Sequence, residues 1–494
     1  MVAGARSLER VTVVIALDQG TTGSTALVLD EGGQVLGRGY RELPQHFPMP
    51  GLVEHDPEEI WQTTLAAARE ALGNARVSRR DITAIGITNQ RETTVLWDRR
   101  TGKALWRAIV WQDRRTAERC RQLDRALIAE KTGLVPDPYF SATKLEWLIG
   151  AVGTARNAAF GTVDSWLVHK LTKGRAHVTD PSNASRTMLY DIGTHAWDPE
   201  LLELFGVPDD ILPEVKPSSG IFGLADAEWF GHEVPIAGIA GDQQAALYGQ
   251  GCFEAGDAKN TYGTGAFLLL NTGEERVHSS RGLLTTIACD RAGGPAYALE
   301  GSVFIAGAAV QWLRDGLGLI AQANETEQLA RSVSDAGGVV FVPALAGLGA
   351  PHWEAEARGA IFGLTRGATK AHLVRATLEA MAFSTKDVLD AMTGDAGLAL
   401  ADLKVDGGAA ANDWLMQYQA DVLGVPVRRP DVVESTALGA AGLAGLATGV
   451  WKTAADFMAA RRYHEFKPGP KPEDRWKEWQ RAVGATLAWA RNRG

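Results

Sequence analysis

One short pattern occurs twice in this chain and limits its architecture more than any other feature. The apolar segment Val11–Leu17 leads into the turn Asp18-Gln19-Gly20-Thr21-Thr22-Gly23-Ser24 and a second apolar run at 25–29. In the second half of the chain, Asp257–Gly265 leads into the apolar run Ala266–Leu270. Each copy predicts a β-hairpin with an unusually polar tip. Two such hairpins predict two similar domains that face each other across a cleft.

Strand-like and helix-like segments alternate along the chain. Apolar runs at 11–17, 25–29 and 82–87 are interleaved with helical patterns over Pro57–Leu72 and Thr116–Lys131. This alternation is typical of an α/β fold.

The sequence also indicates where the domains divide. The stretch Phe253–Gly256 follows the helix-like segment 243–250 and marks the predicted boundary. We expect an N-terminal domain over 1–255, a C-terminal domain over 256–450, and an extension over 451–494 that ends in a surface helix at 472–490. A chain of 494 residues is long enough for several hydrophobic cores.

Composition excludes several classes of function. The net charge of −9 gives no general electrostatic footprint for nucleic acid, so a small-molecule substrate is expected. Cys120, Cys252 and Cys289 lie far apart and predict reduced core thiols in a cytoplasmic protein. The start of the chain resembles a signal peptide, but its apolar run is short and meets Asp18, so it predicts a buried strand. No apolar stretch approaches the roughly 18 residues of a membrane helix.

The chemistry of the first turn suits a phosphate group. Its glycines let the backbone approach a phosphate closely, its hydroxyls add hydrogen bonds, and the Asp18 carboxylate can hold Mg²⁺. A decorated hairpin without a ligand is the alternative. The second hairpin repeats this logic at Tyr262-Gly263-Thr264-Gly265.

Two further turns follow strand-like segments. Gly241-Asp242-Gln243-Gln244 follows Val234–Ala240, and the glycine-rich run 406–412 follows Leu403–Val405. Glycines at a strand-to-helix turn suit a nucleotide, whereas Asp242 and Asp406 could simply cap helices. The phosphate loop G-x4-G-K-[ST] is absent, because Gly102-Lys103 continues with alanine. The split turns are similar to the ATP cleft of actin, hexokinase and Hsp70.

Seven blocks of the sequence occur in one order, at 18–22, 51–57, 86–94, 109–112, 137–141, 241–244 and 259–265. Together they resemble the FGGY family of carbohydrate kinases, and the likeness runs from about residue 11 to about 450. The resemblance implies two actin/hexokinase-like (ribonuclease H-like) domains flanking an ATP cleft, with ATP as cosubstrate and Mg²⁺ as cofactor. The run 89–94 (Asn-Gln-Arg-Glu-Thr-Thr) and the run 137–141 (Asp-Pro-Tyr-Phe-Ser) are similar to members that phosphorylate glycerol to sn-glycerol 3-phosphate, the first step of glycerol catabolism.

The resemblance assigns roles to individual residues. Asp242 is the implied general base, and Asp18 is the implied Mg²⁺ ligand. The implied polyol-binding residues are Arg91, Glu92, Trp111, Tyr139, Asp242, Gln243 and Phe267. The implied ATP-binding residues are Gln19, Gly20, Thr21, Thr22, Gly23, Thr264, Gly307, Gln311, Gly408 and Asn412.

Purely structural interpretations of these residues stay open. Arg91 and Glu92 could be a solvated surface pair, and they can share a pocket only if the run 88–94 leaves strand geometry, because neighbours on a strand point to opposite faces. Trp111 and Phe267 could be core aromatic residues, and Gly307 could be a helix-packing glycine.

The sequence departs from the family at some positions. Many relatives carry an arginine, which would bind ATP phosphates, where this chain has Thr25. The loop Gly231–Glu233 is too short to copy a fructose-bisphosphate loop, and His232 is either a regulatory phosphorylation site or an exposed residue. The alternatives to glycerol phosphorylation are another FGGY polyol or sugar kinase and an actin-like ATP-binding regulator without turnover. A homodimer or homotetramer is compatible with the family, and domain closure with little ATP hydrolysis in the absence of polyol is expected.

Overall fold

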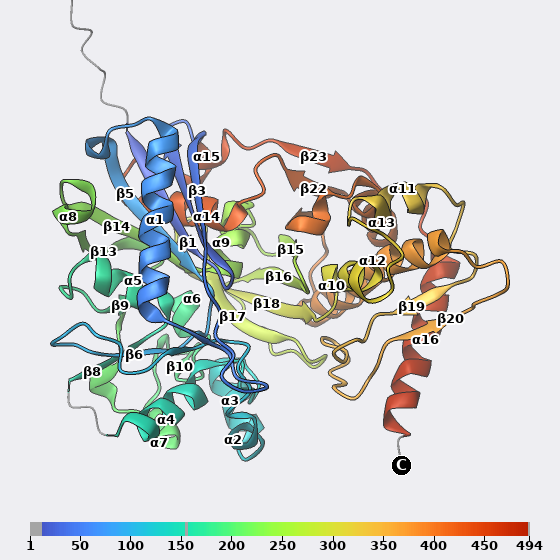
Figure 1. Ribbon diagram of the computed structural model, residues 1–494, viewed down its shortest axis with the longest axis horizontal. Helices are drawn as coiled ribbons and strands as arrows, with labels where there is room; N and C mark the ends of the chain where they lie inside the picture. Colours follow the sequence, from blue (N-terminus) through green and yellow to red (C-terminus); the bar gives the residue numbers. More distant parts are fainter. Residues whose placement is uncertain (1–11, 154–156, 493–494) are drawn as a thin grey trace, which may run out of the picture. The chain divides into compact units, whose positions relative to one another are not determined.

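The computed structural model (Figure 1) describes residues 12–153 and 157–492, so the predicted strand residue Val11 and the segment before it lie outside the described residues. The chain divides into two compact units. Unit 1 comprises 1–251, 286–296 and 435–460, and unit 2 comprises 252–285, 297–434 and 461–494. The predicted division of the chain at 255 stays a prediction.

The first predicted hairpin is confirmed in unit 1. β1 (Val13–Gln19) pairs antiparallel with β2 (Gly23–Asp30) and parallel with β5 (Ile82–Asn89). The strands extend further into the polar turn than the apolar runs indicate. The six-stranded sheet has the order β13-β14-β5-β1-β2-β3, with β3 (Val35–Glu42), β13 (Ser219–Ala225) and β14 (Val234–Gly241) completing it.

The sheet that lies mainly in unit 2 repeats this pairing and confirms the second hairpin. β15 (Ala258–Tyr262) pairs antiparallel with β16 (Ala266–Gly273) and parallel with β21 (Leu403–Asp406). The order β3-β2-β1-β5-β14 thus corresponds to β18-β16-β15-β21-β22. Each sheet adds an antiparallel strand at one end of this set, β13 in one and β23 in the other. The second sheet has a seventh strand, β17 (Leu284–Cys289), beside β18. The other strands of the second sheet are β18 (Pro295–Val303), β22 (Val427–Pro430) and β23 (Tyr463–Phe466).

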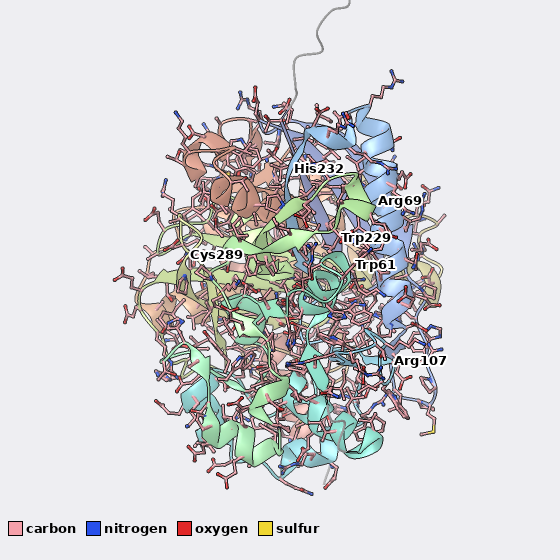
Figure 2. All side chains as sticks on the ribbon, turned by 90° about the vertical axis from the view of Figure 1, so that its left-hand side faces the viewer. Trp61, Arg69, Arg107, Trp229, His232 and Cys289 are labelled. Atoms are coloured by element: carbon pink, nitrogen blue, oxygen red, sulfur yellow. The ribbon has the colours of Figure 1, made fainter. Side chains whose placement is uncertain are left out.

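Helices cover the two faces of the unit 1 sheet. α1 (Pro57–Ala75) confirms the helix predicted over 57–72 and packs against β3 and β2. Its Trp61 lies against Trp229 of α8 (Ala227–Phe230), with ring centres 4.9 Å apart (Figure 2). On the other face, α14 (Ser435–Ala447) packs against β14, β5 and β1.

α9 (Asp242–Gly249) carries the predicted base and lies against α14. The two helices approach very closely, because a Cβ atom added at Gly439 would overlap the carbonyl oxygen of Ala245. Alanines and glycines on both helices make this contact possible. Backbone-to-backbone packing against α14 therefore fixes the position of α9.

Some predicted elements differ in detail. The segment 116–131 forms two helices, α2 (Ala117–Arg121) and α3 (Arg125–Thr132), because the Asp124 carboxylate accepts hydrogen bonds from the first amides of α3. In the stretch 303–313, β18 continues to Val303 and α10 (Gly307–Gln311) starts later. At the C-terminus, α16 (Glu473–Arg491) matches the helix predicted at 472–490, and β23 precedes it.

The remaining elements are short or lie around the two sheets. The remaining strands are β4 (Glu54–His55), β6 (Val95–Asp98), β7 (Ala108–Ile109), β8 (Ala158–Gly161), β9 (Val178–Thr179), β10 (Tyr190–Asp191), β11 (Ala196–Trp197), β12 (Glu214–Val215), β19 (Val340–Val342) and β20 (Ala360–Phe362). The remaining α-helices are α4 (Ser141–Val152), α5 (Val163–Leu171), α6 (Pro181–Ala184), α7 (Pro199–Phe205), α11 (Glu325–Arg331), α12 (Lys370–Ala396), α13 (Asp413–Leu423) and α15 (Ala454–Met458). Single 3-10 turns occur at 79–81, 209–211 and 408–411, and a π-helical turn at 312–316.

The three cysteines are as predicted, whereas His232 is less exposed than one of its two interpretations requires. Cys120, Cys252 and Cys289 are buried and unpaired, as predicted, and burial raises the pKa of Cys252 to about 12. His232 is half-buried rather than exposed, with its Nε2 atom 3.1 Å from the carbonyl oxygen of Ile82 (Figure 2). Within residues 12–153 and 157–492, no helix is both long enough and apolar enough to cross a membrane.

The close approach of α9 and α14 leads to a stability prediction. Gly439→Ala is expected to lower the free energy of unfolding by about 1–3 kcal/mol, because the new methyl group has no space beside Ala245. Gly484→Ala in α16 is the control, since a Cβ there meets nothing within 4 Å and alanine favours a helix by about 1 kcal/mol. Thermal unfolding of both variants measures the difference. Equal effects of the two substitutions would contradict the packing argument.

Candidate active site

Arg91 and Glu92 lie at the point where β5 ends in unit 1. Strand geometry stops at Asn89, and Glu92 has a positive φ of 62°. The condition for the two side chains to share a pocket is therefore met. Only 2% of Arg91 and 1% of Glu92 is exposed, so the interpretation as a solvated surface pair is wrong.

The Arg91 guanidinium brings predicted site residues together. Its Nε atom lies 3.2 Å from Oδ1 of Asp242, and its Nη2 atom donates to the hydroxyl of Tyr139 at 3.2 Å. Its Nη1 atom donates to Oε1 of Gln244, also at 3.2 Å. The guanidinium thus links β5 to α9 and to the loop before α4.

Asp242 is the first residue of α9, and the N-cap position belongs to Gly241. The alternative that Asp242 is the helix-capping residue is therefore wrong. The N–H group of Gly241 donates to Oγ of Ser182 at 2.9 Å, which fixes the start of the helix. About a third of the Asp242 side chain (33%) is exposed, and neighbouring Gln243 is buried. The Asp242 carboxylate is therefore accessible to a ligand while Arg91 holds it in place.

Trp111 and Tyr139 form an aromatic wall beside this cluster. Their rings meet edge to face with centres 5.5 Å apart, and both are half-buried. The backbone carbonyl of Tyr139 accepts a hydrogen bond from Nζ of Lys144 at 2.6 Å. Burial lowers the pKa of Lys144 to about 7. Lys144 is not among the predicted site residues. Its ammonium group holds the loop before α4 through the carbonyl group of Tyr139.

A buried network joins this wall to the first hairpin turn. The indole N–H of Trp111 donates to Oγ1 of Thr21 at 2.9 Å. Gln90 donates to Oε1 of Gln19 at 3.0 Å and accepts from the Thr93 hydroxyl at 2.9 Å. The amide of Gln90 also lies 3.3 Å from Nδ1 of His55. Sequence reasoning did not assign Gln90, Thr93 and His55 to the site, although they lie in the blocks 51–57 and 89–94 that carry the family resemblance.

The first turn uses one of its backbone N–H groups for an internal hydrogen bond. The Gly20 N–H donates to the Gly23 carbonyl at 2.9 Å, so this amide is already used within the turn, and Gly23 itself is buried. The hydroxyl-bearing residues Thr21 and Thr22 are half-buried and exposed. Their hydroxyl groups therefore offer more to a phosphate than the Gly20 amide does.

Asp18 faces two threonines across the sheet. It lies opposite Thr25 in β2 and Thr88 in β5. The family arginine position is thus directly across from the predicted Mg²⁺ ligand. The Thr88 hydroxyl is buried and has no hydrogen-bond partner within the described part of the chain.

Among the described residues, no group of three or more His, Cys, Asp and Glu side chains could hold a metal. One carboxylate suits Mg²⁺ only together with phosphate and water oxygens.

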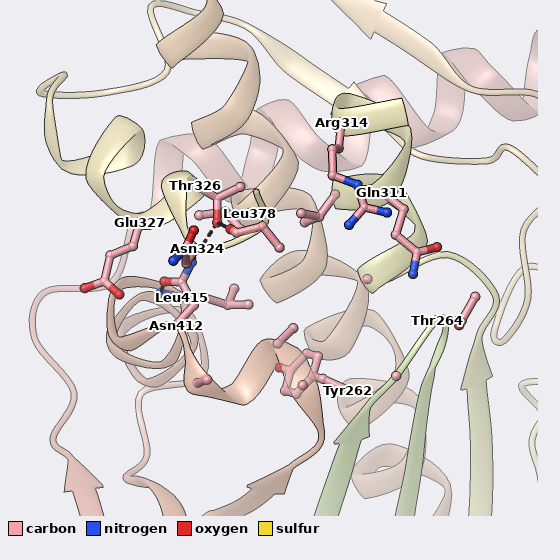
Figure 3. A pocket seen from close by; sticks show the side chains of 17 residues that line it. Tyr262, Thr264, Gln311, Arg314, Asn324, Thr326, Glu327, Leu378, Asn412 and Leu415 are labelled. Atoms are coloured by element: carbon pink, nitrogen blue, oxygen red, sulfur yellow. Dashed lines mark hydrogen bonds between the residues drawn. The ribbon is translucent and has the colours of Figure 1, made fainter. Parts of the chain in front are cut away.

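Unit 2 contains a pocket with a volume of about 470 Å³ (Figure 3). It brings together five of the predicted ATP-binding residues. Its walls combine apolar side chains such as Leu378 and Leu415 with polar ones such as Arg314, which points inward. The predicted residues that line it are Thr264, Gly307, Gln311, Gly408 and Asn412, and lining residues that sequence reasoning missed include Asn324, Thr326 and Glu327.

Backbone contacts shape this pocket. The Gly307 N–H donates to the Gly263 carbonyl at 3.0 Å, and an added Cβ at Gly307 would lie 2.5 Å from that oxygen. Gly307 is therefore a close-packing glycine and a pocket residue at once. Asn412, not Asp406, caps the following helix by accepting from the Leu415 N–H, and its Nδ2 atom donates to Thr326 at 3.2 Å. The capping interpretation of Asp406 is wrong because this residue ends β21.

Phe267 belongs to a different unit from the other predicted polyol-binding residues. It lies half-buried on β16 in unit 2, where its carbonyl oxygen accepts from Nζ of Lys259 at 3.3 Å. The other predicted polyol-binding residues belong to unit 1. Its role as an apolar wall stays a prediction.

Both halves of the chain match models of one kinase family. Residues 13–249 match the N-terminal domain of the FGGY family of carbohydrate kinases, and residues 258–448 match its C-terminal domain. The chain belongs to the FGGY family of carbohydrate kinases.

Similarity to individual relatives covers nearly the whole chain. Glycerol kinase of Dechloromonas aromatica (strain RCB) is 56% identical over 491 residues, which cover 97% of this chain and 98% of that protein. The crystal structure of Plasmodium falciparum glycerol kinase with ADP matches with a TM-score of 0.90 and 37% identity, covering 97% of this chain and 98% of that chain. Gluconate kinase from Lactobacillus acidophilus has a TM-score of 0.88 at 21% identity, over 98% and 99% of the two chains, and shares the fold. The predicted actin/hexokinase-like two-domain α/β fold is confirmed.

The buried His55 gives the network a pH dependence. Burial lowers the pKa of His55 from 6.5 to about 4, so between these values the unfolded chain binds a proton that the folded chain does not. Stability is therefore complete above about pH 6.5 and falls as the pH drops toward 4. His55→Asn keeps an acceptor for Gln90 and removes the titration. From about pH 7.5 to about pH 5, wild type is expected to lose about 2 kcal/mol more unfolding free energy than this variant.

Denaturant unfolding at both pH values measures this difference, and the comparison cancels titrations common to both proteins. The matched control is His278→Asn, because His278 is exposed. The same slope in His55→Asn as in wild type would show that His55 does not titrate in this range.

Proposed function

We propose that this chain transfers the γ-phosphoryl group of ATP to glycerol, giving sn-glycerol 3-phosphate and ADP. The observation that carries the proposal is the buried Arg91 guanidinium that holds Asp242 and Tyr139 together. The relatives at more than 50% identity that are named glycerol kinase support the choice of acceptor.

Asp242 is the proposed general base. Its carboxylate is partly exposed, and Arg91 beside it favours the ionised form. It accepts the proton of the terminal hydroxyl of glycerol as the oxygen attacks the γ-phosphorus, and ADP leaves on the opposite side. Arg91, Glu92, Tyr139 and Gln243 bind the hydroxyl groups of glycerol. Trp111, together with Phe267, covers its carbon stem.

The nucleotide occupies the unit 2 pocket in this proposal. Gly307, Gln311, Gly408 and Asn412 contact adenine and ribose, and Thr264 contacts the phosphates. Gln19, Gly20, Thr21, Thr22 and Gly23 form the phosphate-binding turn, as the sequence predicts. Asp18 would hold Mg²⁺ together with phosphate oxygens, and the ion would neutralise phosphate charge when bound. With Thr25 in place of arginine, the threonine hydroxyl groups of the first turn carry more of the phosphate binding.

The proposal extends to the organisation of the protein. Residues 1–255 supply the polyol and most phosphate contacts, residues 256–450 supply the nucleotide contacts, and 451–494 form an extension. Turnover requires the two sets of contacts to act on one phosphoryl group. We place this reaction in the cytoplasm and expect a homodimer or homotetramer.

The first test is an ADP-release assay with Mg-ATP and separate acceptors. Glycerol, dihydroxyacetone, erythritol, xylulose and gluconate are compared for wild type and Asp242→Asn. Wild type is expected to prefer glycerol, and Asp242→Asn to lower kcat by about 10²–10⁴ because the general base is lost. Glu473→Gln, which changes the first residue of α16, controls for an acid at a helix start. Preference for a sugar identifies another FGGY kinase, and ATP binding without any turnover identifies a regulator.

The second test concerns the nucleotide pocket. A Cβ at Gly408 meets nothing within 4 Å, so Gly408→Val is expected to fold normally and to fill space that the nucleotide needs. The KM for ATP is expected to rise at least about tenfold, while the KM for glycerol stays within about twofold. Gly484→Val serves as a control outside the pocket. An unchanged KM for ATP would place the nucleotide elsewhere.

A further inference from the structure

Arg186 is a fully buried arginine that the proposed function does not use. It follows α6 in unit 1, and 0% of its side chain is exposed. Its Nε atom donates to Oε1 of Glu92 at 2.6 Å. Its guanidinium carbon lies 5.6 Å from the ring centre of Tyr139 and 5.1 Å from that of Phe140. One side chain thus contacts two residues of the polyol site.

Glu92 requires such a partner. A carboxylate that is 1% exposed loses most of its hydration, and burial favours its protonated form unless a positive charge lies close by. Arg91 Nε is 3.6 Å away, further than Arg186 Nε at 2.6 Å. Arginine stays protonated in proteins, so Arg186 supplies a permanent charge.

The backbone of Glu92 is fixed separately from its carboxylate. Its carbonyl oxygen accepts hydrogen bonds from the hydroxyls of Thr94 at 3.1 Å and Ser141 at 3.0 Å. These contacts hold the positive φ of Glu92. The direction and charge of the side chain therefore depend on the two arginines.

We propose that Arg186 is a positioning residue for the polyol site, which keeps Glu92 ionised and directed at the acceptor hydroxyls and supports the ring of Tyr139. This inference rests on the proposed phosphorylation of glycerol. A purely structural role for Arg186 predicts loss of stability without a change in the pH dependence of glycerol binding. The two roles are therefore separable.

The test compares Arg186→Met and Arg186→Lys with wild type by steady-state kinetics across pH. The methionine variant is expected to raise the KM for glycerol about ten- to a hundredfold, the loss expected for a hydrogen bond to a charged group. Its KM for ATP stays within about twofold, because the nucleotide residues are untouched. The lysine variant keeps the charge and is expected to recover part of the loss.

The pH profile is the decisive measurement. Without Arg186, Glu92 takes up a proton at higher pH than in wild type, so the KM for glycerol rises earlier as the pH falls. The charged and titratable groups around Glu92 are Arg91 on its own segment, Arg186 after α6, Lys144 in α4, Tyr139 before α4 and, through Arg91, Asp242 in α9. All except Arg186 are common to wild type and variants, so the difference between profiles isolates Arg186.

Arg475→Met is the matched control. Arg475 pairs with the buried Glu379 in unit 2 and touches none of the polyol residues proposed here. This variant is expected to lose stability and to keep the wild-type KM and pH profile for glycerol. A shifted profile in Arg475→Met would mean that loss of any buried ion pair has this effect, which overturns the inference.

The outcomes separate this inference from the proposed function. Wild type that fails to phosphorylate glycerol overturns the proposed function. Active wild type with an unchanged KM and pH profile in Arg186→Met overturns the role of Arg186 alone, as does an equal rise in both KM values. If Arg186→Met does not fold, the neutral variant Arg186→Gln decides, because it also removes the charge, and an unchanged KM and pH profile in that variant overturn the proposal as well.

Discussion

The buried charge of Arg91 is the constraint on which the acceptor side of this protein depends. A guanidinium taken out of water is tolerated only with close anionic or hydrogen-bonding partners. Here the charges alternate from Arg186 through Glu92 and Arg91 to Asp242. The first three are almost completely buried, and Asp242 at the end is a third exposed. This series of ion pairs therefore ends at Asp242, whose partly exposed carboxylate a ligand can reach.

Local sequence signals were sufficient for several central elements of the scaffold. The glycine and threonine turns predicted both hairpins, because a tight turn between two apolar runs leaves few other structures. The pattern over 57–72 predicted α1, and Val234–Ala240 followed by a polar turn predicted the strand and helix that carry Asp242. These elements depend on periodicity and on residues close together in sequence, which a single chain displays directly.

The partners of the site residues could not be predicted in the same way. Arg186 lies 94 residues from Glu92, and Trp111 lies 90 residues from Thr21. Such pairs form only after the sheet has set the positions of distant segments. Some local details were predicted wrongly because a single side chain decides them. Asp124 starts a new helix and divides a continuous helical pattern, and Asn412 takes the capping role expected of Asp406.

The two hairpins have the same topology, yet each needs a different segment to fix its tip. In the first, Gly20 bonds to Gly23 within the turn, and the Trp111 indole holds the Thr21 hydroxyl from outside. In the second, Gly263 bonds to Gly265 within the turn, and the start of α10 closes on it through Gly307. A polar turn on a hairpin is flexible by itself. Each tip is held by a segment that is distant from it in the sequence. A substitution of Trp111 or Gly307 therefore affects a turn to which neither residue belongs. For this reason a turn motif alone does not define a site.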